Sequence, residues 1–121
     1  MNDSQPVFVQ IMEAIESDIM TGVYQTDDLI ISTNQIAKLY GVNPTTAVKA
    51  VAKLTDAGVL YKRRGIGMCV APGASAMISQ RRRAVFMDQT IPELLAEAAT
   101  LGLTLEELID VIQTKKGTTN D

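Results

Sequence analysis

The sequence predicts a mainly α-helical fold that contains one small β-hairpin. Apolar residues recur at intervals of three and four through most of the 121 residues, which is the period of an amphipathic helix. Two short apolar runs instead flank a basic, glycine-containing turn at 62–67, and this pattern is typical of a hairpin. Because Pro72-Gly73 interrupts the pattern, we expect a domain at 1–72 and a helical segment at 73–121.

The first predicted helix covers about residues 6–21. Its apolar stripe consists of Phe8, Ile11, Met12, Ile15 and Ile19, and its acidic residues Glu13, Glu16 and Asp18 lie off that stripe. Pro6 suits the first helical turn and Gly22 suits the end of the helix.

Two short helices are expected next, with a tight turn between them. The segment Ser32 to Gln35 has the spacing of a capping box and predicts a helix over 33–40. Gly41 can adopt the left-handed conformation that ends a helix. Asn43-Pro44 then supplies an N-cap and a favoured first residue, so a third helix is expected over 44–57.

The predicted hairpin pairs residues 59–61 with 68–70, and Cys69 is expected to be buried on its apolar face. Beyond the hairpin, a helix over 75–89 should break or kink near Ile91-Pro92, because proline lacks the backbone donor. That helix should continue to Leu101. After a turn at Gly102, the capping-box pair Thr104 and Glu107 predicts a last helix over 105–114.

Charge is segregated along the chain, although the net charge is only -3. Residues 1–34 carry six acids and no Lys or Arg, whereas residues 35–83 carry nine bases and the single acid Asp56, a local charge of +8. Residues 84–121 hold seven acids and two lysines. A basic segment within an acidic chain indicates a surface that faces a polyanion.

Composition excludes several function classes. The chain has no histidine and one cysteine, so the usual metal, haem and Ser-His or Cys-His sites cannot be assembled, and we expect no enzyme activity, metal or cofactor. The longest uncharged apolar run, 68–78, contains Pro72 and is too short to cross a bilayer. No secretory signal precedes the first helix, which favours a cytoplasmic location.

Two short helices with a tight turn, followed by a basic hairpin, are the pattern of a winged helix-turn-helix, whose second helix enters the DNA major groove. We therefore expect double-stranded DNA as the partner. The residues expected to contact it are Asn43, Thr45, Thr46, Lys49 and Lys53 in the helix, and Arg63, Arg64, Gly65 and Gly67 in the wing.

Each of these residues also has a purely structural interpretation. Asn43 can be only an N-cap, and the threonines and lysines can form an ordinary solvated helix face. The basic turn can be a solvated loop, and Arg81 to Arg83 point in three directions on a helix and are not counted as contacts.

Together these segments resemble the GntR family of bacterial transcription regulators, and within it the short YtrA-like subfamily. The resemblance lies in Pro6 to Ile11, in Gly41 to Ala50, and in Arg63 to Val70. It implies that Ser32 and Asn34 also meet DNA, since the family usually has Leu-Pro-Ser-x-Arg at this point. Asn34 stands where members of this kind have a DNA-contacting arginine.

The helical segment is expected to dimerise, because it has more apolar residues than two helices can bury between themselves. These residues are Leu94, Leu95, Ala98, Leu101, Leu105, Leu108, Ile109 and Ile112. The resemblance implies that the partner is a second copy, which would bind an inverted-repeat operator as a homodimer, with repression the family's habit. The segment is too short to enclose a metabolite pocket, so no small-molecule effector is required.

A second hypothesis is that the winged domain binds protein or RNA without operator specificity. Single-stranded nucleic acid is usually bound by stacking aromatic side chains, and the basic segment has only Tyr40 and Tyr61. An enzyme would have to rely on carboxylate pairs such as Glu106 and Glu107, which are expected on a solvated helix.

Overall fold

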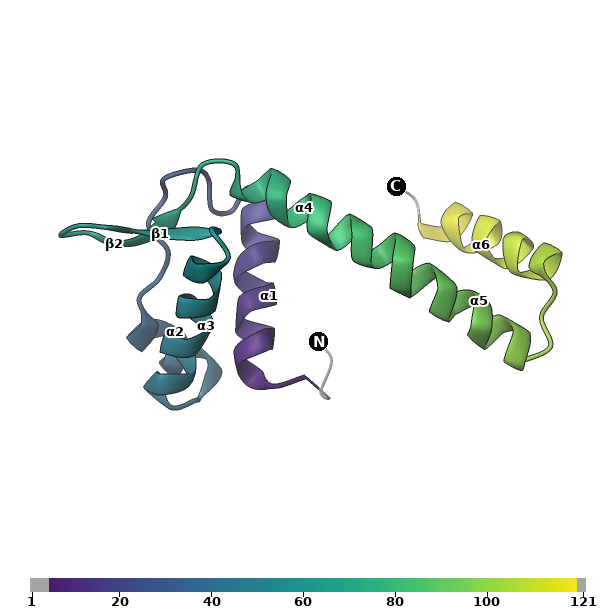
Figure 1. Ribbon diagram of the computed structural model, residues 1–121. Coiled ribbons are helices and arrows are strands. Elements are labelled where there is room, and N and C mark those ends of the chain that lie inside the picture. Colours follow the sequence, from purple (N-terminus) through teal and green to yellow (C-terminus); the bar gives the residue numbers. More distant parts are fainter. Residues whose placement is uncertain (1–4, 120–121) are drawn as a thin grey trace. The chain divides into compact units, whose positions relative to one another are not determined.

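The computed structural model describes residues 5–119, and it is mainly helical with one antiparallel hairpin, as predicted (Figure 1). The chain forms two compact units, which divide between Gln80 and Arg81. This division falls inside helix α4 (Ala74–Val85), not at the Pro72-Gly73 pair. No helix within residues 5–119 is long and apolar enough to cross a membrane.

The N-terminal unit contains α1 (Val7–Met20), α2 (Thr33–Tyr40) and α3 (Pro44–Asp56), followed by the strands β1 (Leu60–Arg63) and β2 (Gly67–Val70). Leu60 pairs with Val70 and Arg63 pairs with Gly67 in the antiparallel hairpin. The hairpin projects beyond the helices, as a wing does (Figure 1). We call residues 60–70 the wing.

One hydrophobic core holds this unit together. Helix α1 contributes Ile11, Ile15 and Ile19 to it. Helix α3 contributes its buried residues, which are Ala47, Ala50, Val51 and Leu54. Burying each such large side chain stabilises the fold by roughly 1.5–3 kcal/mol. Ile78 is also buried in this core, so the first turns of α4 pack with the N-terminal unit.

Both ends of α2 and the start of α3 follow the predicted chemistry. The Ser32 hydroxyl accepts a hydrogen bond from the Gln35 backbone amide at 3.2 Å, and the Gln35 side chain accepts one from the Ser32 amide at 2.9 Å. Gly41 ends α2 in the left-handed conformation, with φ of 64°. Helix α3 begins directly after Asn43, so the helix-turn-helix is confirmed.

A feature that the sequence did not predict fastens the wing to the unit. Residues 27–30 lie along β2, where the amide of Asp27 donates to the carbonyl of Val70 at 2.8 Å and the amide of Ile30 donates to that of Met68 at 3.0 Å. The Val70 amide donates in turn to the carbonyl of Asp28 at 3.0 Å. Strand β2 of the wing is therefore hydrogen-bonded to residues 27–30 as well as to β1. Cys69 is buried, as expected.

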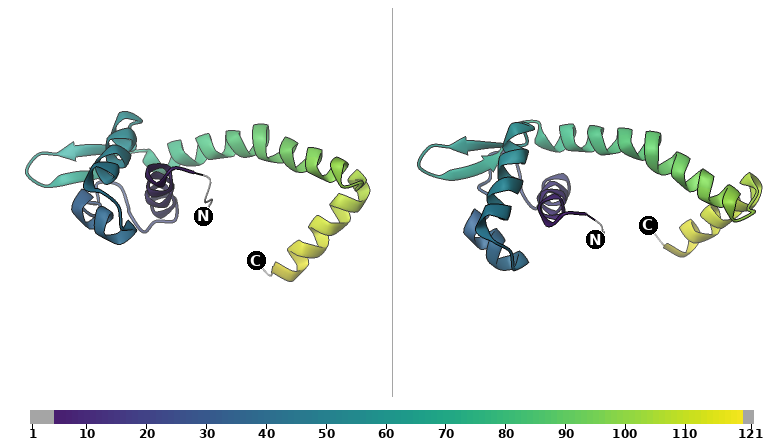
Figure 2. Two further views of the ribbon diagram at one scale, coloured as in Figure 1. Left: turned by 90° about the horizontal axis from the view of Figure 1, so that it is seen from below. Right: turned by 60° about the horizontal axis from the view of Figure 1, so that its bottom comes forward.

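The C-terminal unit contains the end of α4, then η1 (Phe86–Thr90), α5 (Ile91–Thr100) and α6 (Leu105–Thr119). The predicted interruption near Pro92 takes the form of η1, a wider π-helical turn just before the proline. The chain reverses around Gly102, so α5 and α6 form a helical hairpin (Figure 2). Helix α6 ends later than the predicted residue 114.

Candidate nucleic-acid interface

The N-terminus of α3 is fixed by Asn43, whose role as an N-cap is confirmed. Its Oδ1 accepts hydrogen bonds from the Thr45 backbone amide at 3.0 Å and from the Thr45 hydroxyl at 2.9 Å. A carbonyl oxygen has two lone pairs, so this cap occupies both of them. Bidentate pairing of Asn43 with adenine needs the same oxygen and would have to displace one of these bonds.

The outward side of α3 presents three side chains in line. Thr45, Val48 and Ala52 are exposed and follow one another at spacings of three and four, so they share one face of the helix. We call these three residues the outer face of α3. Val48 is 52% exposed, whereas the predicted contact Thr46 is only half-exposed.

Lys49 and Lys53 lie at one edge of this face, beside α1. The Lys49 ammonium group is 4.1 Å from the centre of the Phe8 ring, and that of Lys53 is 5.8 Å from it. Such cation–π contacts at exposed sites contribute about 0.5–1 kcal/mol, so a phosphate group can compete for either lysine. Lys49 and Lys53 are therefore better placed to contact DNA phosphates than base edges.

The wing carries the strongest positive charge in the unit. Lys62, Arg63 and Arg64 are all exposed around its tip. The tip turns through Gly65 at φ of 77° and Gly67 at φ of 136°, values that side chains with a Cβ seldom adopt. A Cβ at Gly67 would meet the Leu29 side chain at 3.0 Å, so glycine is needed there for packing within the protein. Gly65 has open space around it, and the absence of a side chain there allows close approach to a phosphate backbone.

A hydrogen bond between Tyr61 and Asp27 connects strand β1 of the wing to the loop before α2. The Tyr61 hydroxyl donates to Oδ1 of Asp27 at 2.6 Å, and this bond raises the pKa of Tyr61 above its ordinary value. Desolvation and the charge of Asp27 act in the same direction, while Arg63 opposes them. The carboxylate thus ties the loop before α2 to the strand that carries the basic tip.

The two residues implied by the family resemblance lie at the start of α2. The Ser32 hydroxyl takes part in the helix cap, so any contact with DNA would share that oxygen. Asn34 is exposed and lines a shallow depression of about 450 Å³ with Lys38 and Pro44. The short amide of Asn34 therefore stands beside the N-terminus of α3.

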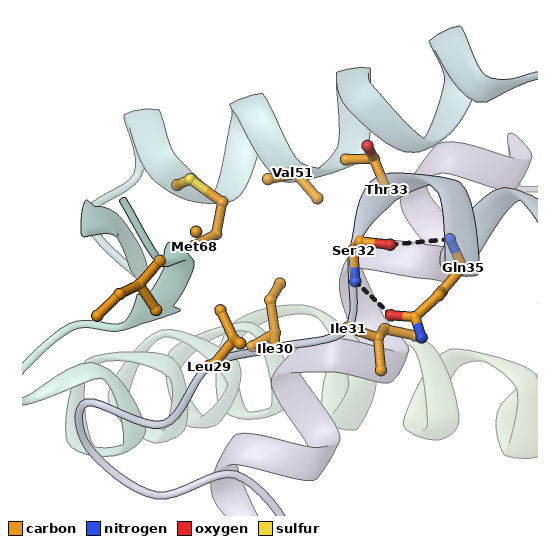
Figure 3. Close-up of a pocket in the computed structure, with 10 residues that line it drawn as sticks. Leu29, Ile30, Ile31, Ser32, Thr33, Gln35, Val51 and Met68 are labelled. Atoms are coloured by element: carbon orange, nitrogen blue, oxygen red, sulfur yellow. Dashed lines mark hydrogen bonds between the residues drawn. The ribbon is translucent and has the colours of Figure 1, made fainter. Parts of the chain in front are cut away.

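Between α2, α3 and the wing the surface is apolar. A depression of about 310 Å³ is lined there by Leu29, Ile30, Val51 and Met68 among others. Figure 3 shows these side chains to one side of the Ser32–Gln35 cap. A neighbouring depression of about 370 Å³ is lined by Val48, Ala52, Lys62 and Met68 among others. Apolar side chains thus lie between the helix and the cationic wing. In the described part of the chain, no cluster of acids or cysteine could hold a metal ion.

Val48 is the candidate contact that the sequence interpretation missed. The signal was present, because Val48 lies outside the inward face that includes Ala47, Ala50 and Val51, and follows Thr45 by three residues. Valine carries no hydrogen-bonding group, so a search for polar and charged side chains on α3 does not select it.

Comparison with known proteins decides the family. The model of the bacterial regulatory proteins, gntR family, matches residues 8–70, which run from the first turn of α1 to the end of β2. The chain belongs to the gntR family. Its members are transcription regulators and not enzymes, so this member of the gntR family is a DNA-binding transcription regulator.

Individual relatives agree with this assignment. The transcriptional repressor YtrA of Bacillus subtilis is 25% identical over 110 residues, which are 91% of this chain and 84% of YtrA. A GntR family regulator from Listeria monocytogenes is 27% identical, with a TM-score of 0.73 over 94% of this chain and 98% of that one. Longer relatives such as the repressor NagR of Bacillus subtilis match over only 27% of their length.

A structural relative has been seen on DNA. The DNA-binding domain of AraR, in complex with its operator ORX1, is 34% identical to this chain. The alignment covers 55% of this chain and 81% of that domain, with a TM-score of 0.53. This gntR-family chain thus shares the architecture of a domain that binds an operator.

Proposed function

We propose that this protein is a sequence-specific repressor that binds an inverted-repeat operator as a homodimer. The observation that carries the proposal is the arrangement of one exposed helix face beside a cationic wing. A helix fits the major groove, and the arginines of the wing can neutralise phosphates on the flanking backbone. Because DNA is the partner, we place the protein in the cytoplasm.

The contacts divide into two kinds. The outer face of α3 and Thr46 are positioned to read base edges, while Lys49, Lys53, Arg63 and Arg64 suit phosphates, which fix register but carry no sequence information. Asn34 would add a short polar contact beside the helix N-terminus in place of an arginine. The operator preference of this protein is therefore set mainly by α3.

The C-terminal unit supports dimerisation. Of the residues predicted to dimerise, Ala98 and Leu108 are buried within the chain and hold α5 to α6. The other six are exposed, and we call them the C-terminal apolar face: Leu94, Leu95, Leu101, Leu105, Ile109 and Ile112. Six exposed large apolar side chains on so small a helical unit favour an interface.

A second copy of the chain is the occupant that this face suits. An isologous two-fold interface needs a surface that is complementary to itself, and two apolar helices per subunit provide one. Two-fold symmetry would set the recognition helices about 34 Å apart or a multiple of that distance, which corresponds to an inverted repeat. Occupancy of such a site near a promoter would exclude polymerase, and no effector is needed for that.

Selection of bound duplexes from a random pool tests the proposal directly. We expect enrichment of an inverted repeat whose half-sites are one helical turn, or a multiple, apart, together with a dimeric mass in light scattering. A reporter placed behind the selected site should be repressed when the protein is expressed. Equal affinity for all duplexes, preference for RNA, or a monomer at micromolar concentration would contradict it.

A further inference from the structure

Helix α3, the proposed recognition helix, exposes apolar side chains on the side that is next to the wing. Val48 is 52% exposed there, with Thr45 one turn before it and Ala52 one turn after it. Val48 and Ala52 are wholly apolar, and Thr45 carries a methyl group beside the hydroxyl that donates to Asn43. A solvated helix face of no function would more commonly carry Lys, Glu or Gln at such positions.

The charged groups of α3 border this surface. Lys49 and Lys53 lean over Phe8 at the edge next to α1, at 4.1 and 5.8 Å from the ring centre. Asp56 is the last residue of the helix. The side-chain oxygen Oδ1 of Asn43 accepts hydrogen bonds from the backbone amide and the hydroxyl of Thr45. Lys49 is exposed four residues after Thr45 and three before Ala52, and Asp56 follows Ala52 by four residues, so both charges border the outer face. On the side next to the wing, Val48 and Ala52 line a depression together with Met68 and Lys62, and there the exposed surface of α3 is apolar.

The major groove contains one apolar group that such a surface can recognise, the C5-methyl group of thymine. Contact between Val48 and this methyl removes both from water. Cytosine and uracil lack the methyl group, so the valine would face a gap. Burial of one methyl group corresponds to about a fourfold change in affinity.

We propose that Val48 is a specificity-determining residue that reads a thymine methyl group, flanked by Thr45 and Ala52. This inference rests on the proposed operator binding and adds a base preference to it. Each half-site should contain a thymine at the position that faces the centre of α3. Readout at this position is by apolar contact and does not need a bidentate hydrogen bond.

Replacement of single thymines by deoxyuridine tests the assignment, because this removes the methyl group and leaves the base pair intact. With the selected operator, we expect one or two positions per half-site at which deoxyuridine weakens wild-type binding about fourfold. The Val48→Ala variant should bind the thymine operator more weakly and should lose most of its sensitivity at those positions. Alanine favours helices, so this variant should fold.

The matched control is Val23→Ala, a valine that is 65% exposed in the loop after α1. It should keep wild-type affinity and wild-type sensitivity to deoxyuridine. Sequence-specific binding that ignores deoxyuridine everywhere, or that shows the same loss in wild type and Val48→Ala, would overturn the role of Val48 alone. Failure to prefer any duplex would overturn operator binding and the role of Val48 with it.

Discussion

Tyr61 and Asp27 lie 34 residues apart and are joined by a hydrogen bond of 2.6 Å from the phenol to the carboxylate. Asp27 has a φ of 70°, a left-handed conformation that is uncommon for a residue other than glycine. Its amide is bonded to Val70, so both its backbone and its side chain are held by the wing. This pair anchors the basic hairpin beside the helices.

Loss of this bond should destabilise the N-terminal unit in a pH-dependent way. The bond raises the pKa of Tyr61 in the folded state, so its contribution is complete below the ordinary value of 10.0. It is lost as the pH rises through the folded-state pKa. We expect Tyr61→Phe to lower Tm at pH 8, with the difference from wild type shrinking above pH 10. Melting curves from pH 7 to 11 measure this.

Asp27→Asn is the matched control for that experiment. Its amide oxygen can still accept the hydrogen bond, but the charge is gone, so the pKa of Tyr61 should fall toward its ordinary value. Absorbance at 295 nm follows the titration of all three tyrosines, so subtracting the curve of Tyr61→Phe isolates that of Tyr61. A Tm difference between wild type and Tyr61→Phe that stays constant across pH would show that the bond contributes nothing specific to the protonated phenol.

The turn between α2 and α3 should depend on glycine at position 41. Its φ of 64° costs a residue with a Cβ about 1–2 kcal/mol, although a Cβ there would meet no atom within 4 Å. We expect Gly41→Ala to lower the free energy of unfolding by about that amount in urea. Gly41→Asn should lose less, because asparagine tolerates this conformation. If wild type, Gly41→Ala and Gly41→Asn were equally stable, the left-handed backbone conformation at position 41 would not require glycine.

Charge on the C-terminal apolar face should dissociate the proposed dimer. Leu105 is 63% exposed and Ile109 is 44% exposed one turn later on α6. Two glutamates at these positions would be desolvated in an interface without a partner charge, which is strongly unfavourable. The double variant should therefore be monomeric in light scattering and bind the full operator much more weakly.

Leu39→Glu is the control for this variant, since Leu39 is 71% exposed on α2 in the other unit. It should remain dimeric. Helix content should be retained in both proteins, which circular dichroism can check. A double variant that is still dimeric would place the interface elsewhere.

The wing and the helix should differ in their effect on salt dependence. Arg64→Ala removes one exposed cation, so the slope of log affinity against log salt should fall by about 1, with similar loss on specific and random duplexes. Thr45→Ala should weaken operator binding but keep the slope. Lys116→Ala, a cation near the end of α6, should change neither quantity. A Thr45 variant that loses equally on random DNA would not be a base reader.

Local chemistry made much of the N-terminal unit predictable. The capping box at Ser32, the left-handed Gly41 and the Asn43 cap depend on residues within four positions of one another, so the sequence marks the ends of α2 and α3. Thr104 and Glu107 form the second predicted capping box in the same way. The basic tip of the wing was evident from composition alone.

Other features depend on residues far apart in the chain. Helical periodicity placed Glu16 off the apolar stripe, yet it is only 3% exposed. Residues 27–30 pair with β2, which is about 40 residues away in the sequence, and no local sequence pattern predicts this pairing. The wide turn η1 replaces the simple break expected near Pro92.

The sequence by itself determined where α2 and α3 begin and end, which segment is basic, and that the chain lacks the residues of common active sites, because these properties are local or compositional. Tertiary packing decided which side chains of α3 are presented outward. Helix α1 packs against α3 and Lys49 lies over Phe8, while Val48 stays exposed on the side of α3 next to the wing. That choice depends on contacts about 40 residues apart, and only the folded chain brings them together.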